Sequence, residues 1–308
     1  ALGYAPAYDS PPLVPEADLD TIAHRIQAWQ EQEEDHFVED LLRLGGSSAG
    51  ARPKVLLRLN GEEWLIKFRS SVDPTDMGTL EYAYHLMAEA AQLEVPPAQL
   101  FPSRKGPGFF GTRRFDRVDG QAIHMHTLSG LLHAAHRVPS LDYQTILKAT
   151  MHLTRDVREC EQQFRACAFN VLSHNRDDHA KNFSFLMDSH GTWRVAPAYD
   201  LTFSAGPRGE HCTMVMGEGK APQLAHVLKL AATCGIQKAK AQAIIDEVVT
   251  AVQQWPLLAD QAGVRARSCC PPLIPPSPWL CVFLACSFAP WVFAPLFSSM
   301  ARSVLLLP

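Results

Sequence analysis

The polar segment at residues 174–182 constrains this chain more than any other feature. It reads His-Asn-Arg-Asp-Asp-His-Ala-Lys-Asn, and it separates a helical pattern at 157–173 from an apolar run that begins at Phe183. Taken singly, Asp177 and Asn182 are ordinary turn residues. Their fixed interval, between a predicted helix and a predicted strand, instead indicates a loop that presents polar side chains to a site.

Phosphoryl transfer requires a carboxylate that orients the attacking hydroxyl, oxygen ligands for Mg²⁺ and a cation near the phosphates. The catalytic loop of protein kinases supplies the first two as an Asp and, five residues later, an Asn. Asp177 and Asn182 have this interval, whereas Asp178 lies one residue too close. We therefore expect Asp177 to be the catalytic base and Asn182 a Mg²⁺ ligand. Lys181 lies inside the same loop, where its cation could meet the transferring phosphate.

A second metal-binding carboxylate is expected on the far strand of the hairpin that follows this loop. Asp200 lies in the segment Ala-Tyr-Asp-Leu at 198–201, at the place where a kinase carries Asp-Phe-Gly. The intervening hairpin would bring it close enough to Asn182 for the two to share one ion. Asp200 is therefore the second predicted Mg²⁺ ligand.

A β-hairpin is predicted at 55–68, because two apolar runs flank Asn60-Gly61, the strongest short-range hairpin signal. The segment Gly-Gly-Ser-Ser-Ala-Gly-Ala at 45–51 precedes it. This segment is not a Walker A sequence, since no Gly-Lys-Ser/Thr follows at the required spacing. Its small residues would let backbone N–H groups approach a phosphate, although most Gly/Ser clusters are plain turns.

Lys67 lies on the second strand of this hairpin, on the face opposite Ile66 and Phe68. A lysine on a strand is usually a solvated edge charge. Here it stands between a glycine-rich loop and a predicted helix that carries Glu81, and active kinases pair such a lysine with a helical glutamate. Glu81, near the start of its helix, could equally be a surface acid favoured by the helix dipole.

The order of the predicted elements indicates an α+β, two-lobed protein-kinase-like fold. A helical pattern at 18–44 comes first, and a helix at 79–93 with Thr79 as its N-cap separates the first hairpin from a second one at 99–115. The later part is predicted to be mostly helical, with helices at 128–136, 142–155, 157–173, 222–233 and 237–255 and one interrupting hairpin at 182–195. We expect a β-rich N-terminal lobe at 1–117, a helical catalytic lobe at 118–264 and an atypical tail at 265–308.

The composition is that of a globular protein. Of the 308 residues, 47% are hydrophobic and 19% are charged, and the net charge of −4 predicts no strong affinity for nucleic acid or anionic membranes. The eight cysteines show no zinc-ligand spacing, so we expect reduced thiols in a cytoplasmic protein. The first residues do not have the pattern of a secretory signal.

The tail at 265–308 contains no Asp, Glu or Lys but is rich in Pro and Cys. Its apolar stretch is interrupted by Pro290 and Pro295, and an uninterrupted membrane span needs about 20 residues. We therefore expect no membrane contact and interpret the tail as a non-native terminus outside the fold.

Four segments together resemble the HipA family of bacterial serine/threonine kinases, the toxins of HipBA-type toxin–antitoxin modules. The segments are Ser-Ser-Ala-Gly-Ala-Arg-Pro-Lys at 47–54, Arg-Phe-Asp-Arg at 114–117, Asp-Asp-His-Ala-Lys-Asn at 177–182 and Ala-Tyr-Asp-Leu at 198–201. They keep the family order, and the resemblance covers about 40 to 255. The segment at 177–182 is the most specific of the four.

The resemblance implies roles for individual residues. Asp177 would be the catalytic base, Asn182 and Asp200 the Mg²⁺ ligands, and Ser47 the autophosphorylated serine. Lys67 would contact the ATP phosphates, and Phe115 would lie in the hinge beside adenine. The residues expected at the ATP site are Ser47, Ser48, Ala49, Gly50, Ala51, Lys54, Lys67, Glu81 and Phe115.

The resemblance also implies a function and partners. The chain would use ATP and Mg²⁺ to phosphorylate a protein, such as an aminoacyl-tRNA synthetase, and would thereby arrest growth and promote persistence. A HipB-like helix-turn-helix antitoxin would be its partner, and it would meet DNA only through that antitoxin. Family members begin with a further small β-rich subdomain, which a separate small subunit would replace here.

Two other functions agree with the same residues. A small-molecule or lipid kinase would use the same constellation, since the sequence shows no acceptor pocket. A catalytically defective remnant would bind an antitoxin or DNA repressor without transferring phosphate. ATP binding without turnover distinguishes the remnant from both kinases, and the class of the labelled product distinguishes the two kinases.

Overall fold

The computed structural model of the chain describes residues 19–32, 52–118, 120–134 and 141–265. The predicted phosphate loop with Ser47, Ser48, Ala49, Gly50 and Ala51 lies outside the described residues, and so does the tail from residue 266 onward. The helical pattern predicted at 18–44 appears as α1 (Leu19–Gln32), and its remainder also lies outside them.

A four-stranded antiparallel sheet forms one end of the molecule. Its strands lie in the order β1 (Lys54–Leu59), β2 (Glu62–Lys67), β4 (Phe109–Arg113) and β3 (Ala98–Phe101). The turn between β1 and β2 places Asn60 and Gly61 at φ 51° and 84°, which Asn and Gly tolerate and β-branched residues do not. Both predicted hairpins are therefore present.

Helix α1 packs against one face of this sheet. Leu19, Ile22 and Ile26 form a buried cluster with sheet residues, among them the cross-strand pair Val55 and Ile66. Because side chains alternate along a strand, the neighbouring residues of β1 and β2 face the other way. That second face carries the lysines of the site described below.

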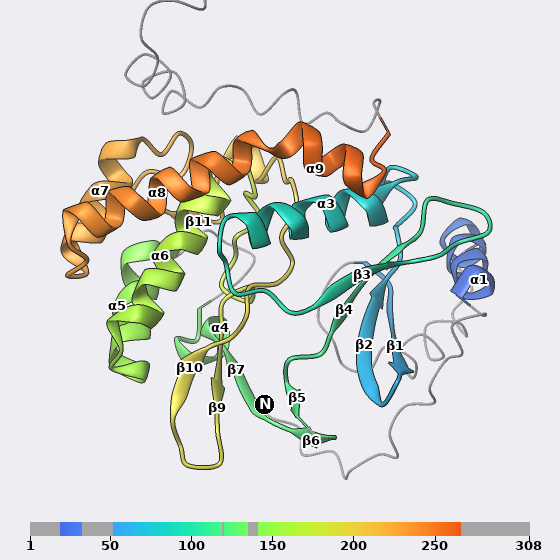
Figure 1. Ribbon diagram of the computed structural model, residues 1–308, viewed down its shortest axis with the longest axis horizontal. Helices are drawn as coiled ribbons and strands as arrows, with labels where there is room; N and C mark the ends of the chain where they lie inside the picture. Colours follow the sequence, from blue (N-terminus) through green and yellow to red (C-terminus); the bar gives the residue numbers. More distant parts are fainter. Residues whose placement is uncertain (1–18, 33–51, 119, 135–140, 266–308) are drawn as a thin grey trace, which may run out of the picture.

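Helix α3 (Met77–Ala90) lies beside α9 (Trp255–Ala262) (Figure 1). The rings of Tyr84 and Trp255 are 5.0 Å apart, and the buried Tyr84 hydroxyl donates to the carbonyl of Ser173. Helix α3 begins two residues earlier than predicted, so Thr79 is not its N-cap. Its hydroxyl instead lies inside the first turn and donates to the carbonyl of Asp76.

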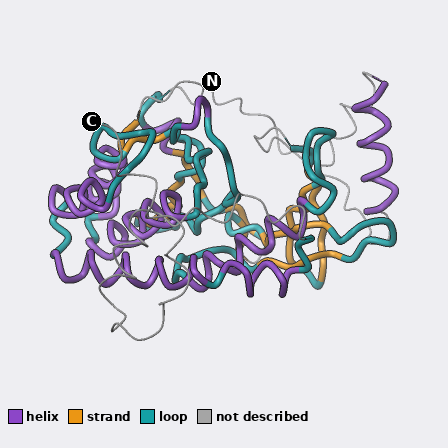
Figure 2. The backbone as a smooth tube through the Cα atoms, turned by 90° about the horizontal axis from the view of Figure 1, so that it is seen from above, coloured by secondary structure: helices purple, strands orange, loops and turns teal. Residues whose placement is uncertain are grey.

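The other end of the molecule is helical (Figure 2). Its helices are α4 (Leu128–Leu131), α5 (Tyr143–Thr154), α6 (Val157–Leu172), α7 (Leu224–Thr233) and α8 (Lys238–Gln253). Helices α5, α6, α7 and α8 share one large hydrophobic cluster with α3 and α9. Helix α3 is thus packed into the helical core while it also contacts β3 and β4 of the sheet.

A small sheet of β7 (His124–Thr127), β9 (Ser184–Met187) and β10 (Trp193–Val195) interrupts the helices, in the order β10-β9-β7. The predicted hairpin at 182–195 is its β9–β10 pair. Four two-residue strands complete the described elements: β5 (Arg117–Val118), β6 (Gln121–Ala122), β8 (Leu141–Asp142) and β11 (Thr213–Met214). A 3₁₀ turn also lies at Pro207–Gly209.

Two predicted helices differ from the observed ones. The helix expected at 128–136 ends after one turn at Leu131. The helix expected at 237–255 ends at Gln253, and the separate helix α9 follows it. Pro256 explains the break, because it has no N–H to continue the α8 hydrogen-bond ladder and is favourable in a first helical turn.

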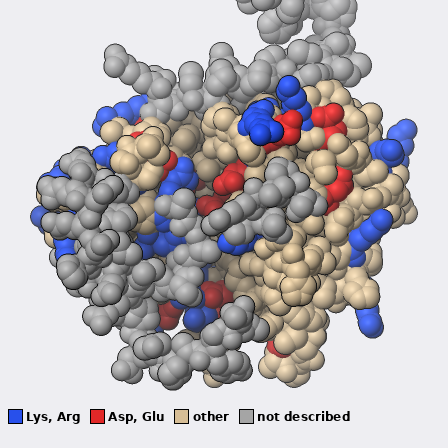
Figure 3. All heavy atoms as spheres, turned by 180° about the vertical axis from the view of Figure 1, so that it is seen from behind, with Lys and Arg blue, Asp and Glu red and all other residues tan. Residues whose placement is uncertain are grey.

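None of the helices in the described residues is both long and apolar enough to cross a bilayer. On the face drawn in Figure 3, acidic and basic side chains lie interspersed.

The boundary between the two lobes, expected near residue 117, stays a prediction.

Two adjacent leucines on α9 test how this helix packs. Leu258 is 8% exposed and belongs to the large cluster, whereas Leu257 is 65% exposed. Replacing Leu258 by Ala should lower the free energy of unfolding by about 2–3 kcal/mol. The same change at Leu257 should cost less than about 0.5 kcal/mol. Urea denaturation measures both, and equal losses would contradict the observed orientation of α9.

Candidate active site

Lys67 is the centre of the site. It ends β2, and its ammonium lies 2.7 Å from Asp200 Oδ1 and 3.3 Å from Glu81 Oε1. Glu81 comes from α3 and is almost fully buried, so it is not the surface acid that its position near a helix start also allowed. The structure therefore brings three of the predicted residues together from a strand, a helix and a loop.

Lys67 and Asp200 are both charged in this arrangement. Burial alone would lower the pKa of Lys67, but the charges of Asp200 and Glu81 outweigh it and raise that pKa above its ordinary value. The positive charge of Lys67 in turn lowers the pKa of Asp200 to about 2. The lysine and the aspartate are therefore an ion pair at neutral pH.

Lys54 lies directly across from Lys67 on the neighbouring strand. Burial and the charge of Lys67 both lower its pKa. Like charges placed opposite each other on a sheet are unfavourable by themselves. Here the carboxylates of Asp200 and Glu81 offset the repulsion, and the pair gives this face of the sheet two adjacent cations.

Asp200 lies beyond the end of β10, not on that strand as predicted. Its backbone has φ 58°, a left-handed conformation that few residues other than Gly, Asn and Asp adopt. The segment thus turns sharply and directs the carboxylate toward Lys67. Its side chain is 38% exposed, so part of the carboxylate still faces solvent.

The loop at 174–182 begins where α6 ends. The amide nitrogen of Asn182 donates to the carbonyl of Asp177 at 2.8 Å, which closes the loop on itself. The hydroxyl of Tyr199 donates to the carbonyl of Lys181 and accepts from Ser184. This bond ties the loop to the residue that directly precedes Asp200.

Asp177 and Asp178 are neighbours with opposite environments. The side chain of Asp177 is 55% exposed, whereas that of Asp178 is fully buried. Asp178 accepts hydrogen bonds from the Tyr143 hydroxyl, from His211 Nδ1 and from the backbone N–H of Thr213. Of the two, Asp177 is therefore the one that can meet another molecule, and its role as the base stays a prediction.

The pKa of Asp177 is raised from its ordinary value. Partial burial is the main cause, and the nearby charges of Asp200 and Asp178 add to it, while His179 opposes it. His179 Nε2 lies 3.9 Å from Asp177 Oδ1. A carboxylate with a raised pKa is a stronger proton acceptor than an ordinary one.

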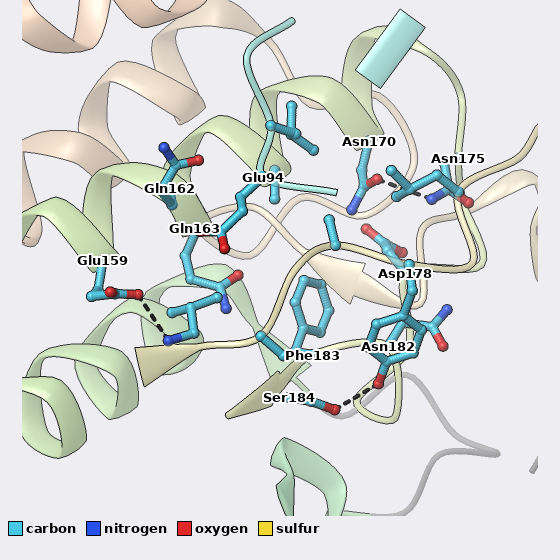
Figure 4. A pocket seen from close by; sticks show the side chains of 17 residues that line it. Glu94, Glu159, Gln162, Gln163, Asn170, Asn175, Asp178, Asn182, Phe183 and Ser184 are labelled. Atoms are coloured by element: carbon cyan, nitrogen blue, oxygen red, sulfur yellow. Dashed lines mark hydrogen bonds between the residues drawn. The ribbon is translucent and has the colours of Figure 1, made fainter. Parts of the chain in front are cut away.

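A chain of buried hydrogen bonds supports the loop from inside. Asn175 donates to Asn170 on α6 (Figure 4). Asn170 donates to the Tyr143 hydroxyl, and Tyr143 donates to Asp178. Burial and the charge of Asp178 raise the pKa of Tyr143 well above its ordinary value, so its hydroxyl stays a donor. The pocket drawn in Figure 4 lies against this inner side of the loop.

Phe115 lies two residues after the end of β4. Its ring centroid is 5.7 Å from that of Tyr199, with an angle of 33° between the planes. Arg114 and Asp116, which flank it, form a bidentate ion pair with distances of 2.9 and 2.7 Å. The predicted hinge aromatic is thus held next to the segment that carries Asp200.

Arg52 was not among the residues predicted at the ATP site. Its guanidinium binds both carboxylate oxygens of Asp73 and also Glu81 Oε1. Asp73 lies in the turn before α3, and no local pattern connects it with Arg52. In the sequence, the one indication that Arg52 lies near the site was that it directly follows the predicted phosphate loop at 45–51.

The described parts of the chain contain no group of three or more His, Cys, Asp or Glu side chains that could hold a metal. The four described cysteines are Cys160, Cys167, Cys212 and Cys234, and all of them are free thiols.

Comparison with known proteins agrees with this fold. The model of the HipA-like C-terminal domain family matches residues 46–255, which is more than half of the chain. The sequence matches none of the curated proteins.

Two solved structures are similar to the chain. One is HipA of Shewanella oneidensis MR-1, solved with HipB and operator DNA, with a TM-score of 0.56 and 15% identity over 74% of this chain. This chain spans 61% of that protein's length. The other is the proinflammatory kinase CtkA of Helicobacter pylori, with a TM-score of 0.43 and 14% identity over 68% of this chain and 94% of that protein.

The match to the Shewanella structure confirms the predicted α+β, two-lobed kinase-like fold. Together with the family match across residues 46–255, it shows that this chain belongs to the HipA-like C-terminal domain family.

Proposed function

We propose that this chain is an ATP- and Mg²⁺-dependent kinase that phosphorylates serine or threonine in a protein. The position of Lys67, fixed between the carboxylates of Glu81 and Asp200, supports this most strongly. A preoriented ammonium in a partly dry site stabilises the negative charge of phosphates without having to reorganise.

The exposed carboxylate of Asp177 supports its role as the base. In this proposal it orients the attacking hydroxyl and accepts its proton, and its raised pKa favours that transfer. Lys181 belongs to the same loop and offsets charge on the phosphate that is transferred. The internal bond from Asn182 to the Asp177 carbonyl keeps the loop in one shape during this step.

Asn182 and Asp200 fit a Mg²⁺ ion. The nitrogen of the Asn182 amide is already used as a donor, which leaves its oxygen as an acceptor. Asp200 is ionised, and part of its carboxylate is exposed. Few protein oxygens suffice, since Mg²⁺ usually keeps waters and phosphate oxygens as its other ligands. When bound, the ion would neutralise phosphate charge.

The remaining predicted residues complete an ATP site in this proposal. Lys54 and Lys67 contact the phosphates from the face of the sheet opposite α1, and Phe115 lies beside adenine. The loop with Ser47, Ser48, Ala49, Gly50 and Ala51 covers the phosphates. Phosphorylation of Ser47 by the enzyme itself would place about two negative charges on that loop and repel ATP, which makes the kinase self-regulated.

The partners follow from the family. The Shewanella protein was solved with HipB and operator DNA, and we propose a HipB-like antitoxin for this chain, with DNA contacted only through it. We propose a cytoplasmic toxin that phosphorylates a translation component such as an aminoacyl-tRNA synthetase and so promotes persistence.

Incubation of the purified chain with labelled ATP, Mg²⁺ and a cell lysate tests the function. We expect label on a lysate protein and, on the chain itself, at Ser47 or Ser48. Label on a metabolite or lipid would instead support a small-molecule or lipid kinase. Bound but unconsumed ATP would overturn the proposal in favour of a remnant that binds an antitoxin or repressor.

Asp177 and Asp178 provide a matched pair for a second test. Asp177→Asn should reduce phosphate transfer by about 100-fold or more, because it removes the base, while stability changes little. Asp178→Asn should lower the free energy of unfolding by about 1–3 kcal/mol, because its amide group meets buried donors. Transfer rates and denaturation curves separate the two effects. An active Asp177→Asn variant would rule out the assignment of the loop.

The Mg²⁺ site is tested by Asp200→Asn, with Asp260→Asn on the exposed side of α9 as control. The first change should weaken Mg²⁺-ATP binding by about tenfold or more, the effect of one lost contact to a charged group. The loss of affinity should be smaller when ATP is titrated without Mg²⁺. The control variant should bind Mg²⁺-ATP with the wild-type affinity. Calorimetry measures the affinities of the wild-type chain and of both variants, with and without Mg²⁺. A loss that does not depend on Mg²⁺ would contradict Asp200 as a metal ligand.

A further inference from the structure

Arg52 makes a bridge between the start of the sheet and the helix that carries Glu81. Its Nε and one terminal nitrogen lie 2.9 and 3.0 Å from the two carboxylate oxygens of Asp73. Its other terminal nitrogen lies 3.3 Å from Glu81 Oε1. One guanidinium therefore uses three donors on two carboxylates, a geometry that the planar fork of arginine supports and a lysine ammonium does not.

The oxygen that Arg52 contacts is the one that Lys67 contacts. Both cations lie 3.3 Å from Glu81 Oε1, and the Glu81 side chain is only 3% exposed. A carboxylate this deeply buried depends on its partners for charge compensation. With Arg52 on one side and Lys67 on the other, Glu81 is held in a single orientation.

The far end of the bridge is itself fixed. Asp73 accepts hydrogen bonds of 2.8 Å from both the backbone N–H and the hydroxyl of Ser70. On the other side, the carbonyl of Pro53, which directly follows Arg52, accepts from the N–H of Phe68. Arg52 thus spans two anchored backbone segments and is not an exposed ion pair of the kind that contributes little.

We infer that Arg52 is a positioning residue, which orients Glu81 and thereby aims Lys67 at the phosphates. This inference rests on the proposed kinase function and adds to it a residue that touches neither nucleotide nor substrate. Arg52 also links the end of the predicted phosphate loop to α3.

The test compares Arg52→Gln, Arg52→Lys and Asp73→Asn with the control Arg158→Gln. Arg158 forms a similar bidentate pair with Asp156 on α6, but its side chain is 85% exposed. We expect kcat to fall roughly 10- to 100-fold in Arg52→Gln, the scale of a misplaced catalytic group. Arg52→Lys should not rescue it, because it keeps the charge but loses the fork.

A double-mutant cycle separates positioning from general damage. If Arg52 acts through Glu81, adding Arg52→Gln to Glu81→Gln should cause no further loss of kcat. Melting curves show whether each single variant is folded. If Arg52→Gln does not fold, Asp73→Asn tests the same bridge with Arg52 still in place.

The outcomes distinguish the inference from the function on which it rests. If the wild-type chain is active, three results would each overturn the inference alone. They are a wild-type kcat in Arg52→Gln, full rescue by Arg52→Lys, and additive losses of kcat when Arg52→Gln is combined with Glu81→Gln. A folded wild-type chain that does not turn over ATP would overturn the proposed function and the inference with it.

Discussion

The ion pair of Lys67 and Asp200 joins residues that are 133 positions apart, and the rest of the site depends on it. The Lys67 side chain is only 13% exposed, so its charge requires the carboxylate of Asp200, and Glu81 adds a second carboxylate. The last residue of β2, the buried face of α3 and the turn after β10 must therefore meet at one point. Packing of α3 on α9 and on the sheet holds the helix where this requirement is met.

The loop at 174–182 has a second support that is independent of these charges. Its buried residues Asn175 and Asp178 are the two ends of a hydrogen-bond chain that runs through α6 and α5. Buried polar networks of this kind define one arrangement, because any other would leave donors and acceptors unpaired. The buried side chain of Asp178 thus anchors the loop, while the carboxylate of the adjacent Asp177 stays exposed. In this account Asp178 has a structural role and Asp177 the catalytic one.

Local signals made much of the fold predictable. The Asn60-Gly61 turn determined the first hairpin, and helical periodicity determined α5, α6, α7 and α8. The start of α3 was misplaced because both Asp76 and Thr79 are residues that commonly cap helices, and packing decides between them. Strand β7 was missed because four residues carry little periodic signal and its partner β9 lies far along the chain.

The candidate site could be predicted where its residues belong to a fixed spacing, as Asp177, Asn182 and Asp200 do. Spacing also separated Asp177 from Asp178, but only the structure shows that Asp178 is buried in a network. Arg52 was beyond such reasoning, since its contacts with Asp73 and Glu81 join segments 21 and 29 positions away. Contacts between distant segments that follow no repeating pattern are the hardest contacts to predict from a single sequence.

The central claim is that the cluster around Lys67 is a site for nucleotide and metal. A crystal structure of the chain with Mg²⁺ and a non-hydrolysable ATP analogue tests it most directly. The account predicts phosphate oxygens within hydrogen-bond distance of the Lys67 ammonium and one metal ion shared by the Asn182 amide oxygen and the Asp200 carboxylate. A nucleotide bound elsewhere, with Lys67, Glu81 and Asp200 paired only among themselves, would contradict it.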